Sequence, residues 1–105
     1  MLERDIEAYL VKRCKEIGAL CDKFTSPQRR SVPDRLITFR GRVLFVELKA
    51  TGARPTPAQV RDHERRRAAG AEVVWLDSKE AVMVLGEALS DNLDIEVDEE
   101  FKVVC

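Results

Sequence analysis

The chain has 105 residues, of which 45% are hydrophobic and 35% are charged, as is typical of one globular domain. No apolar run approaches the roughly 18 residues that span a bilayer, and the N-terminus lacks a signal-peptide pattern. We therefore expect a cytoplasmic protein with no membrane association.

The net charge of −1 hides an uneven distribution of charged residues along the chain. Residues 1–86 carry 17 Lys and Arg against 12 Asp and Glu, whereas residues 87–105 carry one lysine against seven acidic residues. A basic body favours a polyanionic partner such as nucleic acid.

Cysteine and histidine restrict the chemistry that the chain can perform. Its cysteines are Cys14, Cys21 and Cys105, and its only histidine is His63. These residues assemble neither a disulfide framework nor a zinc site, and a single histidine disfavours a Ser-His-Asp or Cys-His nucleophile. Oxygen ligands should therefore hold any catalytic metal, which favours magnesium or manganese.

The N-terminal third predicts a helix, a short strand and a polar loop. Residues 2–17 form the helix, because apolar side chains recur there every three or four positions and Gly18 follows as a stop. Residues 19–24 predict a strand. Residues 25–33 predict a loop with two prolines and the adjacent pair Arg29 and Arg30.

Residues 34–49 predict a tight β-hairpin that gathers three charged side chains. Its strands, residues 34–39 and 43–49, are rich in β-branched and aromatic residues, and Gly41 can supply the positive φ of a short turn. A turn at 40–41 places Asp34 opposite Glu47, and a turn at 41–42 places it opposite Lys49. Either register puts all three side chains on one face of the sheet. They could form a cation-binding catalytic site, or simply the solvated face of an antiparallel sheet.

The following segments predict a crossover to a further strand and a last helix. Thr56, Pro57 and Gln59 carry the signature of a capping box, which starts a basic helix that ends at Gly70. We expect His63 on the surface of this helix or at an interface. Residues 72–76 predict a buried strand that includes Trp75 and pairs in parallel with the preceding strand. Residues 78–89 predict the last helix.

The acidic segment that follows has no clear periodicity, although residues 101–104 could dock as a strand. We therefore divide the chain into a domain of residues 1–89 and an acidic C-terminal tail of residues 90–105. The tail could cover a DNA-binding face, approach a partner subunit, or remain a solvated extension.

The element order and five short motifs together resemble a known nuclease family. The motifs lie at residues 3–6, 24–30, 32–35, 46–49 and 56–59. They are similar to those of the small stand-alone VRR-NUC nucleases of phages and bacteria, which belong to the PD-(D/E)XK (restriction-endonuclease-like) superfamily. The resemblance covers roughly residues 2–85. It departs from the family pattern at Gln28 and Ser31, where the loop often carries glycine.

The resemblance implies an α/β fold and a role for each motif residue. The fold is a restriction-endonuclease-like core of order α-β-β-β-α-β-α, a mixed sheet with helices packed on it. Asp34, Glu47 and the Leu48 carbonyl would hold Mg²⁺ or Mn²⁺, and Lys49 would assist the attacking water. Glu3 would be a further acidic group, with Glu7 as the competing candidate. Gln59 would orient the site, although its capping box explains it equally well.

The implied function is cleavage of DNA. We expect a metal-dependent, structure-selective DNA endonuclease in a bacterial or phage-infected cell, cutting four-way (Holliday) junctions as a homodimer. The alternatives are a less selective nicking or flap nuclease, an RNA-directed nuclease, and an inactive nucleic-acid-binding accessory protein. The residues expected to contact the DNA are arginines: Arg29, Arg30, Arg35, Arg61 and Arg65.

Overall fold

The computed structural model describes residues 1–105, and its elements follow the predicted order α-β-β-β-α-β-α. They are α1 (Glu3–Ile17), β1 (Leu20–Lys23), β2 (Arg35–Phe39), β3 (Arg42–Leu48), α2 (Pro57–Ala68), β4 (Glu72–Leu76) and α3 (Lys79–Ser90). No helix combines the length and the apolar character that crossing a membrane requires. Predicted and observed boundaries differ by one or two residues.

The four strands form one mixed sheet in the order β1-β2-β3-β4. The first three strands are antiparallel, and β3 and β4 are parallel, as a crossover through α2 requires. Arg35 pairs with Val46 in the β2–β3 hairpin, and both residues of its turn, Arg40 and Gly41, have positive φ. This register continues to Asp34 opposite Glu47, so the first of the two predicted registers is confirmed.

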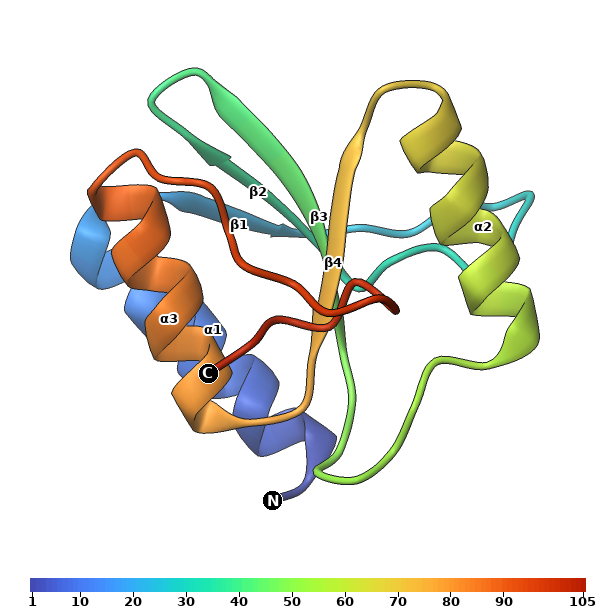
Figure 1. Cartoon of the computed structure of the whole chain (residues 1–105), viewed down its shortest axis with the longest axis horizontal. Coiled ribbons are helices and arrows are strands. Elements are labelled where there is room, and N and C mark those ends of the chain that lie inside the picture. The colour runs from blue at the N-terminus through green and yellow to red at the C-terminus, as the bar shows by residue number, and fades with distance from the viewer.

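Helices cover both faces of the sheet, with α1 and α3 on one face and α2 on the other (Figure 1). The face towards α1 and α3 carries the core, where Leu44, Val46 and Leu48 of β3 are fully buried. Because side chains alternate along a strand, Glu47 points to the opposite face, towards α2. The second face therefore carries the polar chemistry of the hairpin.

Helix α2 begins where the sequence predicts, at a complete capping box. The Thr56 hydroxyl accepts from the Gln59 amide at 3.2 Å, and the Gln59 side chain accepts from the Thr56 amide at 2.9 Å. This start fixes the position of the helix relative to the end of β3.

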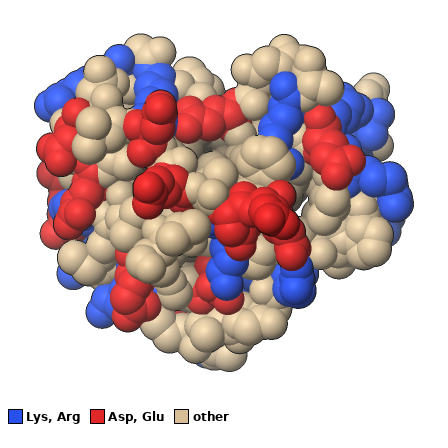
Figure 2. Space-filling view, viewed as in Figure 1, with Lys and Arg blue, Asp and Glu red and all other residues tan.

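The C-terminal segment, residues 91–105, is part of the fold. Trp75 of β4 donates its amide to the Phe101 carbonyl at 3.1 Å and accepts from the Val103 amide at 2.9 Å, so residues 101–103 extend the sheet beyond β4. Ile95 and Val103 belong to the hydrophobic core. The solvated-extension prediction is therefore wrong, whereas docking of residues 101–104 is confirmed. Acidic side chains gather at the middle of the face shown in Figure 2, where Figure 1 places this segment in front of β4.

Candidate active site

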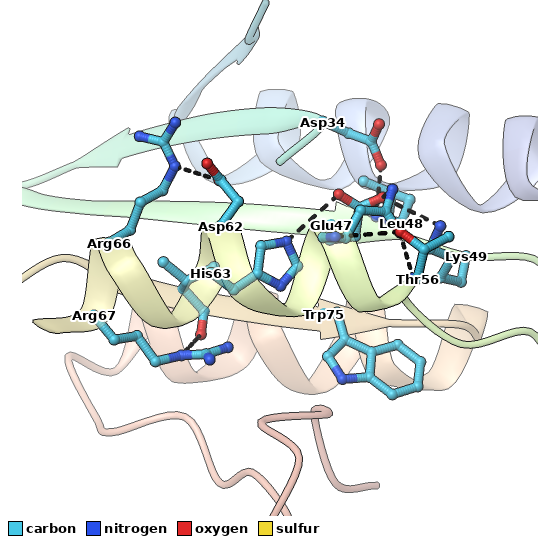
Figure 3. A network of polar contacts seen from close by, with 12 residues as sticks. Asp34, Glu47, Leu48, Lys49, Thr56, Asp62, His63, Arg66, Arg67 and Trp75 are labelled. Carbon is cyan, nitrogen blue, oxygen red and sulfur yellow. Dashed lines mark hydrogen bonds and ion pairs between the residues drawn. The ribbon is translucent and has the colours of Figure 1, made fainter. Parts of the chain in front are cut away.

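The open end of the β2–β3 hairpin brings Asp34 and Glu47 together. Asp34 Oδ2 accepts a hydrogen bond from the Leu48 amide at 2.8 Å, which fixes the Asp34 carboxylate beside β3 (Figure 3). Lys49 Nζ lies 3.7 Å from Glu47 Oε2, and the Lys49 side chain is only 13% exposed. The three residues predicted to form the catalytic centre therefore converge, and the side chains of Glu47 and Lys49 are largely shielded from solvent.

Glu47 is the most unusual charged residue of the chain, because it is 1% exposed. Burial, followed by the negative charge of Asp34, raises the pKa of Glu47 to about 9. Lys49 opposes this shift only in part. Glu47 Oε1 has no hydrogen-bond partner at all. A buried carboxylate of this kind is costly unless a cation accompanies it, so the position points to function rather than to stability.

Gln59 serves the helix and the site at the same time. Its Oε1 accepts from the Thr56 amide, and its Nε2 donates to Glu47 Oε2 at 3.3 Å. The capping interaction thereby orients the amide group, so that its donor end faces the carboxylate. The two roles that the sequence left open for Gln59 are compatible.

His63 lies one turn further along α2 and also faces Glu47. It is 2% exposed, and its Nε2 is 3.7 Å from Glu47 Oε1. Burial, together with the positive charge of Arg67, lowers the pKa of His63 to about 4, so the imidazole is neutral near neutral pH. The prediction of a helix-surface or interface position is wrong, since the surrounding arginines of α2 suggested a solvated helix.

Glu3 and Glu7 on α1 have different surroundings. Glu3 is exposed, but partial desolvation and then the negative charge of Asp34 raise its pKa, so Glu3 lies near the acidic centre. Glu7 instead accepts from Arg35 Nε at 2.8 Å and lies 3.9 Å from Lys23 Nζ. Arg35 also donates to the Cys21 carbonyl. Glu3 is therefore the better placed of the two carboxylates, and Arg35 is engaged within the protein.

The donor set fits a hard divalent cation. No three His, Cys, Asp or Glu side chains form a metal-binding cluster. The acidic oxygens come from Asp34 and Glu47, with Glu3 close enough to affect both electrostatically. Magnesium and manganese bind through few carboxylates and keep several waters, and a cation here would offset the repulsion between Glu47 and its acidic neighbours. The partnerless Glu47 Oε1 is consistent with such an ion.

Four of the five predicted DNA-binding arginines line one hollow. Its volume is about 410 Å³, and its walls come from the 25–33 loop and from α2. The arginines are Arg29, Arg30, Arg61 and Arg65, with Ser31, Ala58 and Asp62 between them. Arg35 is not among them. The hollow therefore concentrates positive charge at one place on the surface, as contact with a phosphate backbone requires.

Asp62 lines this hollow, and the sequence analysis did not predict its ion pairs with Arg65 and Arg66. Asp62 is 4% exposed and accepts from Arg65 at 3.0 Å and from Arg66 at 2.8 Å. Although burial opposes it, hydrogen bonding to both arginines lowers the pKa of Asp62. The Arg66 guanidinium also lies about 5 Å from the rings of Phe24 and Phe45. The i, i+3 and i, i+4 spacing within α2 was the available signal.

Comparison with known proteins decides the family. No family model matches the chain. The phage protein "Putative nuclease p44", of Acyrthosiphon pisum secondary endosymbiont phage 1, is 46% identical over 84 residues, which are 79% of this chain and 90% of that protein. A solved structure described as a VRR_NUC domain has a TM-score of 0.74 and 36% identity, covering 81% of this chain and 94% of that one. The chain belongs to the VRR-NUC family of nucleases.

Membership in the VRR-NUC family confirms the resemblance seen in the motifs, and it confirms the fold class. The protein is a nuclease. The hairpin site is the part of this fold where the buried Glu47 carboxylate lies beside Asp34 and Lys49. The roles of the individual residues remain predictions, and they rest on the geometry of this site.

Proposed function

We propose that this VRR-NUC protein is a Mg²⁺- or Mn²⁺-dependent endodeoxyribonuclease of the PD-(D/E)XK type, which hydrolyses phosphodiester bonds at the hairpin site. The observation that carries the proposal is the buried Glu47 carboxylate beside Asp34 and Lys49. An inactive accessory protein would gain nothing from this costly arrangement, because an apolar residue at position 47 would be more stable.

Each side chain has a role that follows from its position. Asp34, Glu47 and the Leu48 carbonyl would hold the cation, with Glu3 as an outer carboxylate. The cation would supply a nucleophilic water near neutral pH and neutralise charge on the phosphate. Lys49 orients the attacking water and stabilises the charge that develops on the phosphate oxygens. Gln59 holds the Glu47 carboxylate from α2.

We propose further that the substrate is branched DNA, in particular a four-way junction, and that the enzyme acts as a homodimer. Two arguments support this. The arginine hollow gives one subunit only a small contact area for DNA, and a 105-residue chain has little surface with which to hold a branched duplex. Paired cuts in a symmetric junction also match two sites related by a two-fold axis.

The experiment is cleavage of linear, flap and four-way-junction DNA of matched sequence, with manganese and with excess EDTA. We expect cleavage only with the metal and fastest on the junction. Equal rates on all three substrates would replace junction selectivity with the less selective nuclease. Undiminished cleavage in EDTA would contradict the metal-dependent mechanism. Sedimentation of the free protein and of its junction complex measures the oligomeric state.

A further inference from the structure

Two buried polar atoms of the site face each other without forming a hydrogen bond. They are His63 Nε2, from α2, and Glu47 Oε1, from β3 (Figure 3). The atoms are 3.7 Å apart, and neither has any other hydrogen-bond partner. Both residues are at least nine-tenths buried. Such pairs of unsatisfied groups are rare in protein interiors, and each needs an explanation.

The geometry of α2 supplies that explanation. Gln59 and His63 are four residues apart and so lie on the same face of the helix. Gln59 Nε2 donates to one oxygen of Glu47, and His63 Nε2 faces the other oxygen. One face of α2 therefore places a side chain beside each oxygen of the Glu47 carboxylate. A neutral imidazole with its proton on Nε2 is a donor to an ionised carboxylate.

A purely structural role explains His63 less well. The two buried residues of α2 are both polar, namely Asp62 and His63. Asp62 is satisfied by Arg65 and Arg66, so its burial is part of a closed ion-pair network. The Nε2 of His63 has no hydrogen-bond partner and lies 3.7 Å from Glu47 Oε1. A core position without function would favour an apolar side chain there.

We propose that His63 is a positioning residue for the nuclease site, donating from Nε2 to Glu47 Oε1 when Glu47 is ionised beside a divalent cation. Gln59 and His63 then fix the orientation of the carboxylate from α2, so that it holds the cation together with Asp34. The inference deepens the proposed function and rests on it, because it names His63 as the residue that orients the proposed metal ligand Glu47. Such support typically contributes about 10- to 100-fold to metal affinity or activity.

The first test compares His63→Leu, which removes the donor and keeps an apolar volume, with His63→Gln, which keeps an amide donor. Cleavage of junction DNA is measured over a manganese series for both variants. We expect His63→Leu to raise the half-saturating manganese concentration about 10- to 100-fold, and His63→Gln to restore most of the loss. Equal and large losses in two folded variants would show a packing role, and unchanged values in His63→Leu would also overturn the proposal.

The second test measures manganese binding without DNA, by the loss of the free-ion electron paramagnetic resonance signal. We expect weaker binding in His63→Leu than in wild type or His63→Gln. Glu64→Gln is the matched control, since Glu64 follows His63 in α2, is exposed and forms no ion pair. It should leave manganese binding unchanged. If His63→Leu does not fold, His63→Phe takes its place.

The two measurements separate this inference from the proposed function. A wild-type protein that binds manganese in a His63-dependent way but cleaves no DNA would retain the positioning role and remove the proposed activity. A wild-type protein that cleaves DNA with manganese, while all His63 variants bind manganese equally well, would retain the activity and remove the positioning role.

Discussion

The acidic residues that lie on the two sides of α2 differ in their burial and in their hydrogen-bond partners. On the hairpin side, Glu47 is 1% exposed and one of its oxygens has no partner. On the other side, the C-terminal segment keeps its acidic side chains at the surface, where Asp98 accepts from the amides of Glu100 and Lys102 and Glu100 pairs with Arg54. The surface arrangement satisfies backbone amides and an arginine and so stabilises the fold, whereas burial at the hairpin disfavours the ionised form of Glu47 and leaves one of its oxygens without a hydrogen bond.

This difference separates structural from functional carboxylates in a chain of which about one-third of the residues are charged. Carboxylates that cap loops and pair at the surface contribute little energy each and need no further explanation. A carboxylate that is buried with insufficient partners opposes folding, so its presence indicates a ligand that the site is built to bind. Substitutions on each side of α2 can test whether the two sides differ in this way.

The largest effect should come from the hairpin side. Asp34→Asn, Glu47→Gln and Lys49→Ala should each lower single-turnover cleavage by at least about two to three orders of magnitude, because in the proposed mechanism each group acts at the transition state. DNA binding should survive in all three variants, and a mobility-shift assay without added divalent metal checks this. A variant that retains more than about one-tenth of the wild-type rate would remove its residue from the catalytic centre.

The next effect concerns DNA affinity. Substituting Ala for Arg29, Arg30, Arg61 and Arg65 together should weaken binding to all DNA sequences alike. The slope of log affinity against log salt should fall by about one unit for each arginine–phosphate ion pair that the substitutions remove. Arg40→Ala is the control, because Arg40 lies in the hairpin turn, away from the hollow. Unchanged affinity and slope in the quadruple variant would mean that DNA binds elsewhere.

The hairpin and its site were largely predictable from the sequence, because the alternation of Leu44, Val46 and Leu48 with Glu47 and Lys49 assigns two faces. The register was not predictable. Gly41 suits either turn position, and the choice depends on Arg40 adopting positive φ, which a non-glycine residue rarely does. Only the assembled sheet determines it.

The surroundings of the site and the C-terminal segment were beyond local patterns. Four arginines made α2 resemble a solvated helix, yet Asp62 and His63 are buried because their partners come from the same helix and from β3. The C-terminal segment lacks periodicity because it meets β4 and itself through isolated bridges rather than a continuous ladder. Both features depend on tertiary contacts that no short window of sequence contains.

The buried state of Glu47 should also be visible as a dependence of stability on pH. The pKa of Glu47 is raised from 4.5 to about 9 in the folded protein, so the folded state binds a proton that the unfolded state releases. Stability in EDTA should therefore fall as pH rises through this range, by up to about 1.4 kcal/mol per pH unit. Chemical denaturation of wild type and Glu47→Gln between about pH 5 and about pH 9 measures it. Parallel curves for the two proteins would contradict the buried, protonated state of Glu47.

The smallest effect should come from the acidic side of α2. Truncation after Leu89 would not test charge, because it removes Ile95 and Val103 from the core. Glu96→Gln with Glu99→Gln is the cleaner variant, since both side chains are exposed and neither forms an ion pair within 4 Å.

None of residues 90–105 lines the arginine hollow, so the tail does not cover that surface. The variant should therefore tighten DNA binding less than about threefold at low salt and not at all at moderate salt, where screening shortens the reach of charge to about 10 Å. Fluorescence anisotropy at two salt concentrations gives both dissociation constants. A more than tenfold gain at low salt would show that the segment competes with DNA, and the two sides of α2 would then act on the same substrate.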